Sequence, residues 1–172
     1  MLSDLQRKLH QELGIPDEYG SQRGLPYWDD ASELTEVGEN LVGRMQHLTP
    51  KAAAQWQKMV QAAATDGIRL MIVSGFRSFE YQAGLIRRKL ENGQAIDEIL
   101  QVNAAPGHSE HHTGTAIDIA TPGSRPLTEE FEESDAFAWL TANAAKFGFQ
   151  MTYPVDNPWG IAYEPWHWAL KA

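Results

Sequence analysis

The sequence predicts a single α+β domain in which a central, mostly antiparallel sheet is flanked by helices. Its 172 residues, 42% of them hydrophobic, are enough to bury one core. Patterns typical of helices come before, between and after short aliphatic segments typical of strands. Because these patterns lack the regular strand and helix alternation of a parallel sheet, they favour the α+β class.

The first 48 residues are predicted to form one helix and an irregular extension of a core region at 49–172. Ser3 is a good N-cap, leucines recur at every fourth position after it, and Gly14 stands where a helix ends. Glycines and prolines then interrupt residues 15–48. We therefore expect an irregular segment there, with one short strand or helix.

Four helices are predicted in the core. The first starts at Thr49 and Pro50, because threonine is a good N-cap and proline suits the first helical turn. Ser78 is the N-cap of the second helix by the same argument. The predicted helices cover residues 50–66, 78–91, 95–102 and 134–146.

The strands of the predicted sheet are short segments rich in aliphatic and aromatic residues. The clearest, Arg69–Val73, is β-branched and ends at a serine and a glycine that are typical of a turn. We expect the other strands at residues 115–120, 149–153 and 166–170.

Charge and hydropathy exclude two classes of partner. With 14 basic and 23 acidic residues, the formal net charge is -9, which leaves no basic surface for nucleic acid. The longest aliphatic run, Leu70–Val73, is far shorter than the roughly 20 residues of a membrane helix, so we expect no membrane insertion. Charged residues interrupt Met1–Gly14, which is unlike a secretory signal, and a cytoplasmic protein is expected.

Potential metal ligands gather in two segments. The chain has no cysteine, so a metal must be held by histidine and carboxylate. One segment runs from Ser109 to Asp118 and the other is Glu164–His167. Two imidazoles and one carboxylate leave a coordination position open for water, the arrangement of a hydrolytic zinc site. Glu164, three positions before His167, suits the base that takes a proton from that water.

The residues alone do not decide which histidine is the first ligand. In a regular strand over 111–118, His112 and not His111 would share a face with Asp118. A turn or bulge at Thr113 and Gly114 would reverse that parity. The histidines at 10 and 47 have no neighbouring ligand set and are expected to face solvent.

The two segments resemble the zinc-binding motifs of the VanY type of D-alanyl-D-alanine carboxypeptidases, within the wider superfamily that includes hedgehog domains. That family has Ser-x-His-x-x-Gly-x-Ala-x-Asp and then Glu-x-Trp-His, and both strings occur here. Upstream, residues 75–78 with Gln82 are similar to the family's Gly-Tyr-Arg-Ser segment. The resemblance covers roughly residues 68–170, and it implies a small α+β domain whose antiparallel sheet carries the metal.

The resemblance also implies a role for each motif residue. One zinc ion is held by His111, Asp118 and His167, which settles the choice of histidine, and Glu164 is the general base and then the acid. Arg77 polarises the scissile carbonyl or its oxyanion, as suits a charged fork donor. The substrate's terminal residue is expected to contact Arg77, Gln82 and Ser109.

The function implied is a zinc carboxypeptidase that removes C-terminal D-alanine from peptidoglycan peptides or muropeptides, at L,D-bonds, D,D-bonds or both. One alternative is a peptidoglycan endopeptidase like some phage lysins, which would clear a suspension of cell walls. The other is a zinc-dependent binding module without activity. Glu164 argues against the binding module, which has no need of a base.

Overall fold

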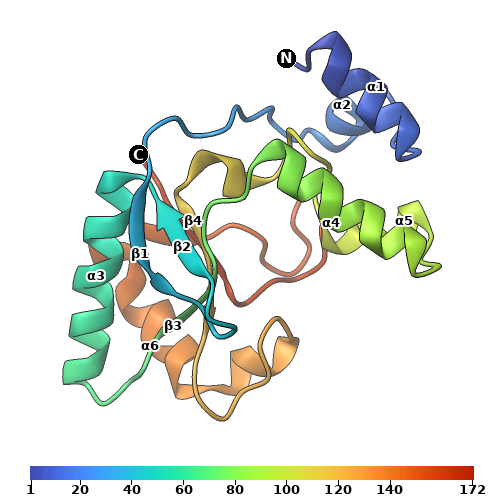
Figure 1. Cartoon of the computed structure of the whole chain (residues 1–172). Coiled ribbons are helices and arrows are strands. Elements are labelled where there is room, and N and C mark those ends of the chain that lie inside the picture. Colours follow the sequence, from blue (N-terminus) through green and yellow to red (C-terminus); the bar gives the residue numbers. More distant parts are fainter.

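The computed structural model describes residues 1–172, folded as six α helices, three short 3-10 helices and two antiparallel sheets (Figure 1). The α+β class and the mostly antiparallel sheet are therefore confirmed. The helices are α1 (Asp4–Glu12), α2 (Tyr19–Arg23), α3 (Pro50–Thr65), α4 (Phe79–Glu91), α5 (Ile96–Val102) and α6 (Asp135–Asn143), with 3-10 helices η1 (Glu110–Thr113), η2 (Glu129–Glu133) and η3 (Ala144–Phe147). The strands are β1 (Thr35–Glu39), β2 (Met45–Leu48), β3 (Met71–Ser74), β4 (Ala116–Ala120), β5 (Phe149–Met151) and β6 (His167–Leu170).

Hydroxyl side chains start four of the helices. Ser3, Thr49, Ser78 and Ser134 each accept a hydrogen bond from a backbone N–H in the first turn of the helix that follows. Such a cap satisfies a donor that the helix leaves without an internal partner. The helix starts expected at these four residues are confirmed.

The larger sheet has the strand order β3-β4-β6-β5, and every neighbouring pair is antiparallel. All five residues of β4 are buried, as expected for a strand with neighbours on both sides. In this register Asp118 pairs with Ser74 of β3 on one side and with His167 of β6 on the other. The register therefore places two predicted metal ligands next to each other on adjacent strands.

Two large hydrophobic cores and one small cluster hold the elements together. The first has 17 buried residues and joins α3 and α6 to the sheet, with Trp56, Met59 and Ala63 on the buried side of α3. The second has nine and joins the α1 and α2 region to α4 and α5. Figure 1 shows this division, with α3 and α6 at the left and the other four helices at the right. No helix of the chain is long and apolar enough to cross a membrane.

Residues 15–48 contain more regular structure than the sequence predicts. They form α2 and a hairpin of β1 and β2, which is the second antiparallel sheet. The hairpin is hard to predict because its residues are mostly exposed or half-buried, with no alternation of apolar and polar side chains. The division of the chain at residue 48 stays a prediction.

The expectation that His10 faces solvent is wrong. Its side chain is 2% exposed and its Nε2 donates a hydrogen bond of 2.7 Å to the carbonyl of Pro106. The ring also stacks on Phe79 of α4, with 6.0 Å between ring centroids. The sequence around His10 gives no sign of these partners, because both come from distant parts of the chain. His47 is half-buried in β2.

Candidate metal centre

Three of the residues predicted from the motifs converge in the interior of the protein. His111 comes from η1, Asp118 from β4 and His167 from the start of β6. One ligand atom of each lies within 4.8 Å of the others, and the residues are 2%, 4% and 2% exposed. Two nitrogen donors and one carboxylate suit Zn²⁺ and leave a further coordination position for water.

The turn at Gly114 decides which histidine faces Asp118. Residues 110–113 are a 3-10 helix and not part of a strand, so the period-two argument does not apply to them. Gly114 has a φ of +66°, a left-handed conformation that turns the chain into β4. His111 Nε2 lies 3.2 Å from Asp118 Oδ1 as a result. The ring of His112 instead bonds the backbone of Gly107 and Arg77.

His111 is oriented as a neutral metal ligand. Its Nδ1 donates to the carbonyl of Gly75 at 2.7 Å, which leaves the lone pair on Nε2. Nε2 is buried and has no hydrogen-bond partner. Burial, helped by the charge of Arg77, lowers the pKa of His111 to about 4, so the ring is neutral near pH 7. A buried nitrogen with a free lone pair and no partner in the protein is suited to bind a metal, so these residues fit the ion.

His167 lies between carboxylates on both edges of its ring. Nδ1 is 3.1 Å from Asp118 Oδ1, and Nε2 is 2.8 Å from Glu110 Oε2. Burial disfavours the imidazolium, but the hydrogen bonds to Asp118 and Glu110 outweigh it and raise the pKa of His167 to about 10. The two carboxylates therefore create a negative surrounding that favours a cation at this place.

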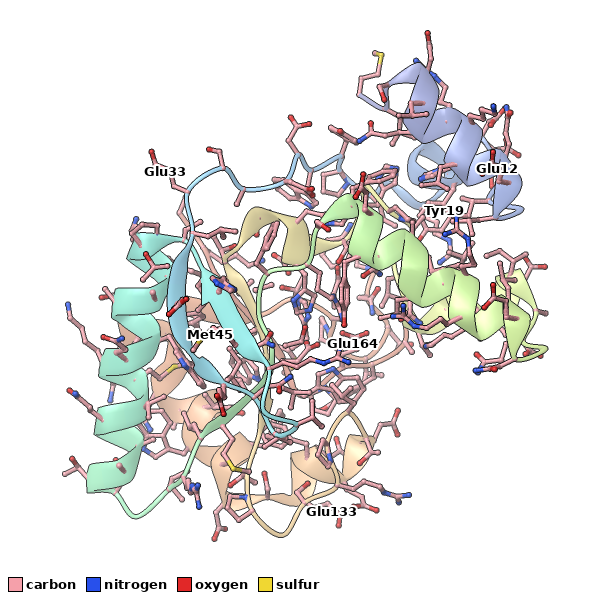
Figure 2. All side chains as sticks on the ribbon, in the orientation of Figure 1. Glu12, Tyr19, Glu33, Met45, Glu133 and Glu164 are labelled. Atoms are coloured by element: carbon pink, nitrogen blue, oxygen red, sulfur yellow. The ribbon has the colours of Figure 1, made fainter.

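Glu164 lies beside the three converging residues. It is 9% exposed, and its Oε2 is 3.6 Å from His167 Nδ1. Burial raises the pKa of Glu164 to about 7, although the charge of His167 opposes the shift. Figure 2 shows Glu164 below α4, in the middle of the molecule. A carboxyl with such a pKa can accept and return a proton near neutral pH.

The three remaining predicted residues differ in whether they line the cavity of the site. Arg77 and Ser109 line a small cavity of about 20 Å³, together with His111, Glu164 and His167. The Nε of Arg77 is buried without a hydrogen-bond partner. Gln82 is not among the lining residues, because its side chain is 1% exposed and donates to the carbonyl of Ala104 at 2.8 Å. A wider groove of about 610 Å³ elsewhere on the surface contains none of these residues.

Glu110 also belongs to the site, although the sequence motifs do not indicate it. The carboxylate contacts His167, Thr152 and Lys171, and Glu110 as a whole is 8% exposed. Despite burial, the partners His167 and Lys171 lower the pKa of Glu110 to about 2. The spacing of the motif does not indicate Glu110, because this position lies between two motif residues and the motif does not specify it. The only signal is an acidic residue directly before a predicted ligand.

The family of D-alanyl-D-alanine carboxypeptidases called VanY matches residues 45–171 of the chain. This chain belongs to that family, so the resemblance of its motifs is confirmed. It is 36% identical over 128 residues to the bifunctional D-Ala-D-Ala dipeptidase and D-Ala-D-Ala carboxypeptidase VanXYC of Enterococcus gallinarum, covering 70% of this chain and 65% of that protein. The chain spans between 39% and 65% of the length of the curated relatives that it matches.

Solved structures of related enzymes have the same fold. The LdcB LD-carboxypeptidase is 30% identical, with a TM-score of 0.73 over 82% of this chain and 69% of that chain. A variant of the vancomycin resistance D,D-pentapeptidase VanY in complex with Zn(II) is 27% identical, with a TM-score of 0.62 over 81% of this chain and 79% of that chain. The two relatives thus act on different bonds, one L,D and the other D,D.

Proposed function

We propose that the chain is a zinc carboxypeptidase that removes C-terminal D-alanine from peptidoglycan stem peptides, at L,D-bonds, D,D-bonds or both. The observation that carries the proposal is the convergence of His111, Asp118 and His167 beside Glu164. Family membership and the zinc complex of the related VanY support the metal and the reaction. The substrate class is supported by the related LdcB, which recognises peptidoglycan.

Zinc held by His111, Asp118 and His167 would lower the pKa of a water and polarise the scissile carbonyl. Glu164 takes the proton from the water as its oxygen adds to the carbonyl carbon. Glu164 then gives that proton to the amine as the carbon–nitrogen bond breaks, so it ends in its starting state. Its pKa of about 7 suits both transfers.

Arg77 stabilises the negative charge that develops on the carbonyl oxygen. It lines the same cavity as Glu164, and a guanidinium is a cationic donor that suits an oxyanion. Its buried Nε has no partner within the protein, so this donor remains available to a substrate. Ser109 also lines the cavity and can donate a hydrogen bond there. Gln82 acts through Ala104, whose carbonyl it holds next to the cavity.

The test uses two defined muropeptides, a tetrapeptide ending in an L,D-bond and a pentapeptide ending in a D,D-bond. Mass spectrometry should show loss of one alanine from at least one of them, no loss after dialysis against a chelator, and recovery with added zinc. Cleavage within the stem peptide would favour an endopeptidase. No cleavage of either peptide by the zinc-loaded protein would contradict the proposal. The cytoplasmic location and the absence of nucleic acid partners stay predictions.

A further inference from the structure

Two glutamates face opposite edges of the His167 ring. Glu164 Oε2 is 3.6 Å from Nδ1, and Asp118 Oδ1 is 3.1 Å from the same nitrogen. Glu110 Oε2 is 2.8 Å from Nε2, on the far edge. Nδ1 is the nitrogen that faces Asp118, another of the three ligands, so Glu110 lies on the side of the ring away from the proposed metal site.

We infer that Glu110 is a positioning residue, which accepts the N–H of His167 Nε2 and so leaves the Nδ1 lone pair directed at the metal. Metal-binding histidines need such a partner, because the acceptor fixes the tautomer and the angle of the ring and increases its basicity as a ligand. This inference rests on the proposed zinc site and adds to it a residue that is not a ligand.

Glu110 is itself held in place by two further donors. The hydroxyl of Thr152 donates to Oε2 at 2.6 Å, and the ammonium of Lys171 bonds Oε1. Lys171 Nζ also donates to Thr152 Oγ1 at 3.1 Å, which closes the network. Thr152 follows β5 and Lys171 follows β6. A buried carboxylate with partners from both segments has a fixed position. Its hydrogen bond with His167 Nε2 therefore fixes the orientation of the ring.

The two histidine ligands are oriented by the same principle but by different acceptors. His111 donates to a backbone carbonyl, that of Gly75, whereas His167 donates to a carboxylate. A charged acceptor makes the stronger hydrogen bond, so it has the larger effect on the ring that it holds. The acceptor of His167 is also a side chain, and mutation can remove it without changing the backbone.

The decisive measurement is zinc affinity, determined by competition with a chromogenic chelator. Glu110→Gln should weaken zinc binding by about 10- to 100-fold, the usual effect of losing such a partner. Glu133→Gln is the matched control, because it removes the same charge at an exposed position and should leave the affinity unchanged. Glu164→Gln should also bind zinc as the wild type does. If Glu110 only formed a structural ion pair with Lys171, its variant would lose stability and keep its zinc affinity, and the inference would be wrong.

A second measurement needs no variant, so it tests the inferred tautomer of His167 even if Glu110→Gln does not fold. Nitrogen-15 NMR of the histidine rings in the zinc-loaded wild type should show the proton of His167 on Nε2. A proton on Nδ1 would overturn the inference. If the wild type binds no zinc at all, the proposed function fails; if it binds zinc equally well with and without the Glu110 carboxylate, only the inference fails.

Discussion

Two buried carboxyl groups of the site have pKa values that move in opposite directions. Despite burial, the neighbouring rings of His111 and His167 hold the pKa of Asp118 well below its usual range. The pKa of Glu164 rises to about 7 because burial dominates there. One carboxyl is therefore always ionised, as a metal ligand must be, while the other exchanges a proton. The difference comes from their surroundings, since the two groups have nearly equal acidity in water.

The first prediction concerns Glu164. Glu164→Gln should lower kcat for alanine release by about 10²- to 10⁴-fold, because the amide has the same shape and cannot take a proton. Zinc content should not change, because Glu164 is not one of the three converging residues. Both quantities are measured on the same purified sample. Turnover close to that of the wild type would show that another group is the base.

Residue types and their spacing predict most of the site, but they do not predict the acceptors around it. His111, Asp118, His167 and Glu164 stand out because four ligand or base residues rarely share two short strings. Glu110 does not stand out, and its role appears only when Thr152 and Lys171 are folded next to it. Gln82 fits the motif, but its side chain donates to the backbone carbonyl of Ala104, and its contact with the substrate stays a prediction.

Among the elements, the turn between η1 and β4 places strict demands on its residue. Gly114 has a φ of +66°, and a Cβ there would lie 3.1 Å from Thr49 Cγ2 and 3.2 Å from Leu34 Cδ2. The position therefore combines a left-handed backbone with tight surroundings. The same turn directs His111 at Asp118, so the element and the site depend on one residue.

Gly114→Ala is predicted to lower the free energy of unfolding by more than the ~1–2 kcal/mol of the left-handed conformation alone. Gly67→Ala is the matched control, because Gly67 has a φ of +77° and nothing within 4 Å of the added Cβ. Denaturant unfolding of both variants gives the comparison. Equal losses of unfolding free energy in the two variants would mean that the atoms around Gly114 move aside at little cost.

The elements that could be predicted have a start signal, an apolar pattern or both. The capped helices α1, α3, α4 and α6 and all four strands of the larger sheet were expected close to their observed ranges. The helix predicted to reach residue 146 ends as an α helix at Asn143 and continues as η3. The hairpin was missed, because it depends on packing against α3 and not on its own sequence pattern.

At the scale of the whole molecule, a buried histidine binds the first residues to the part of the chain that carries the candidate metal centre. Burial lowers the pKa of His10, and His108 adds to the effect, while the hydrogen bond to Pro106 and the charge of Asp17 oppose it. The folded state therefore binds a proton on His10 less readily than the unfolded chain does. Stability from this group is present above the unfolded pKa of 6.5 and is lost as the pH falls below it.

His10→Gln should therefore reduce the dependence of stability on pH. The difference in unfolding free energy between the wild type and this variant is predicted to be larger at pH 7.5 than at pH 5, in each case measured by denaturant titration. The other titrating groups are present in both proteins, so their contributions to the pH dependence of the unfolding free energy cancel in this difference. A difference that stays constant or grows toward acidic pH would contradict the burial of His10.

The order of the strands along the chain has a consequence for synthesis. Asp118 and His167 are 49 positions apart, and only the pairing of β4 with β6 joins them. A chain still growing on the ribosome offers His111 and Asp118 as an incomplete pair of ligands until His167 emerges. Tight metal capture must therefore wait until the sheet has been completed.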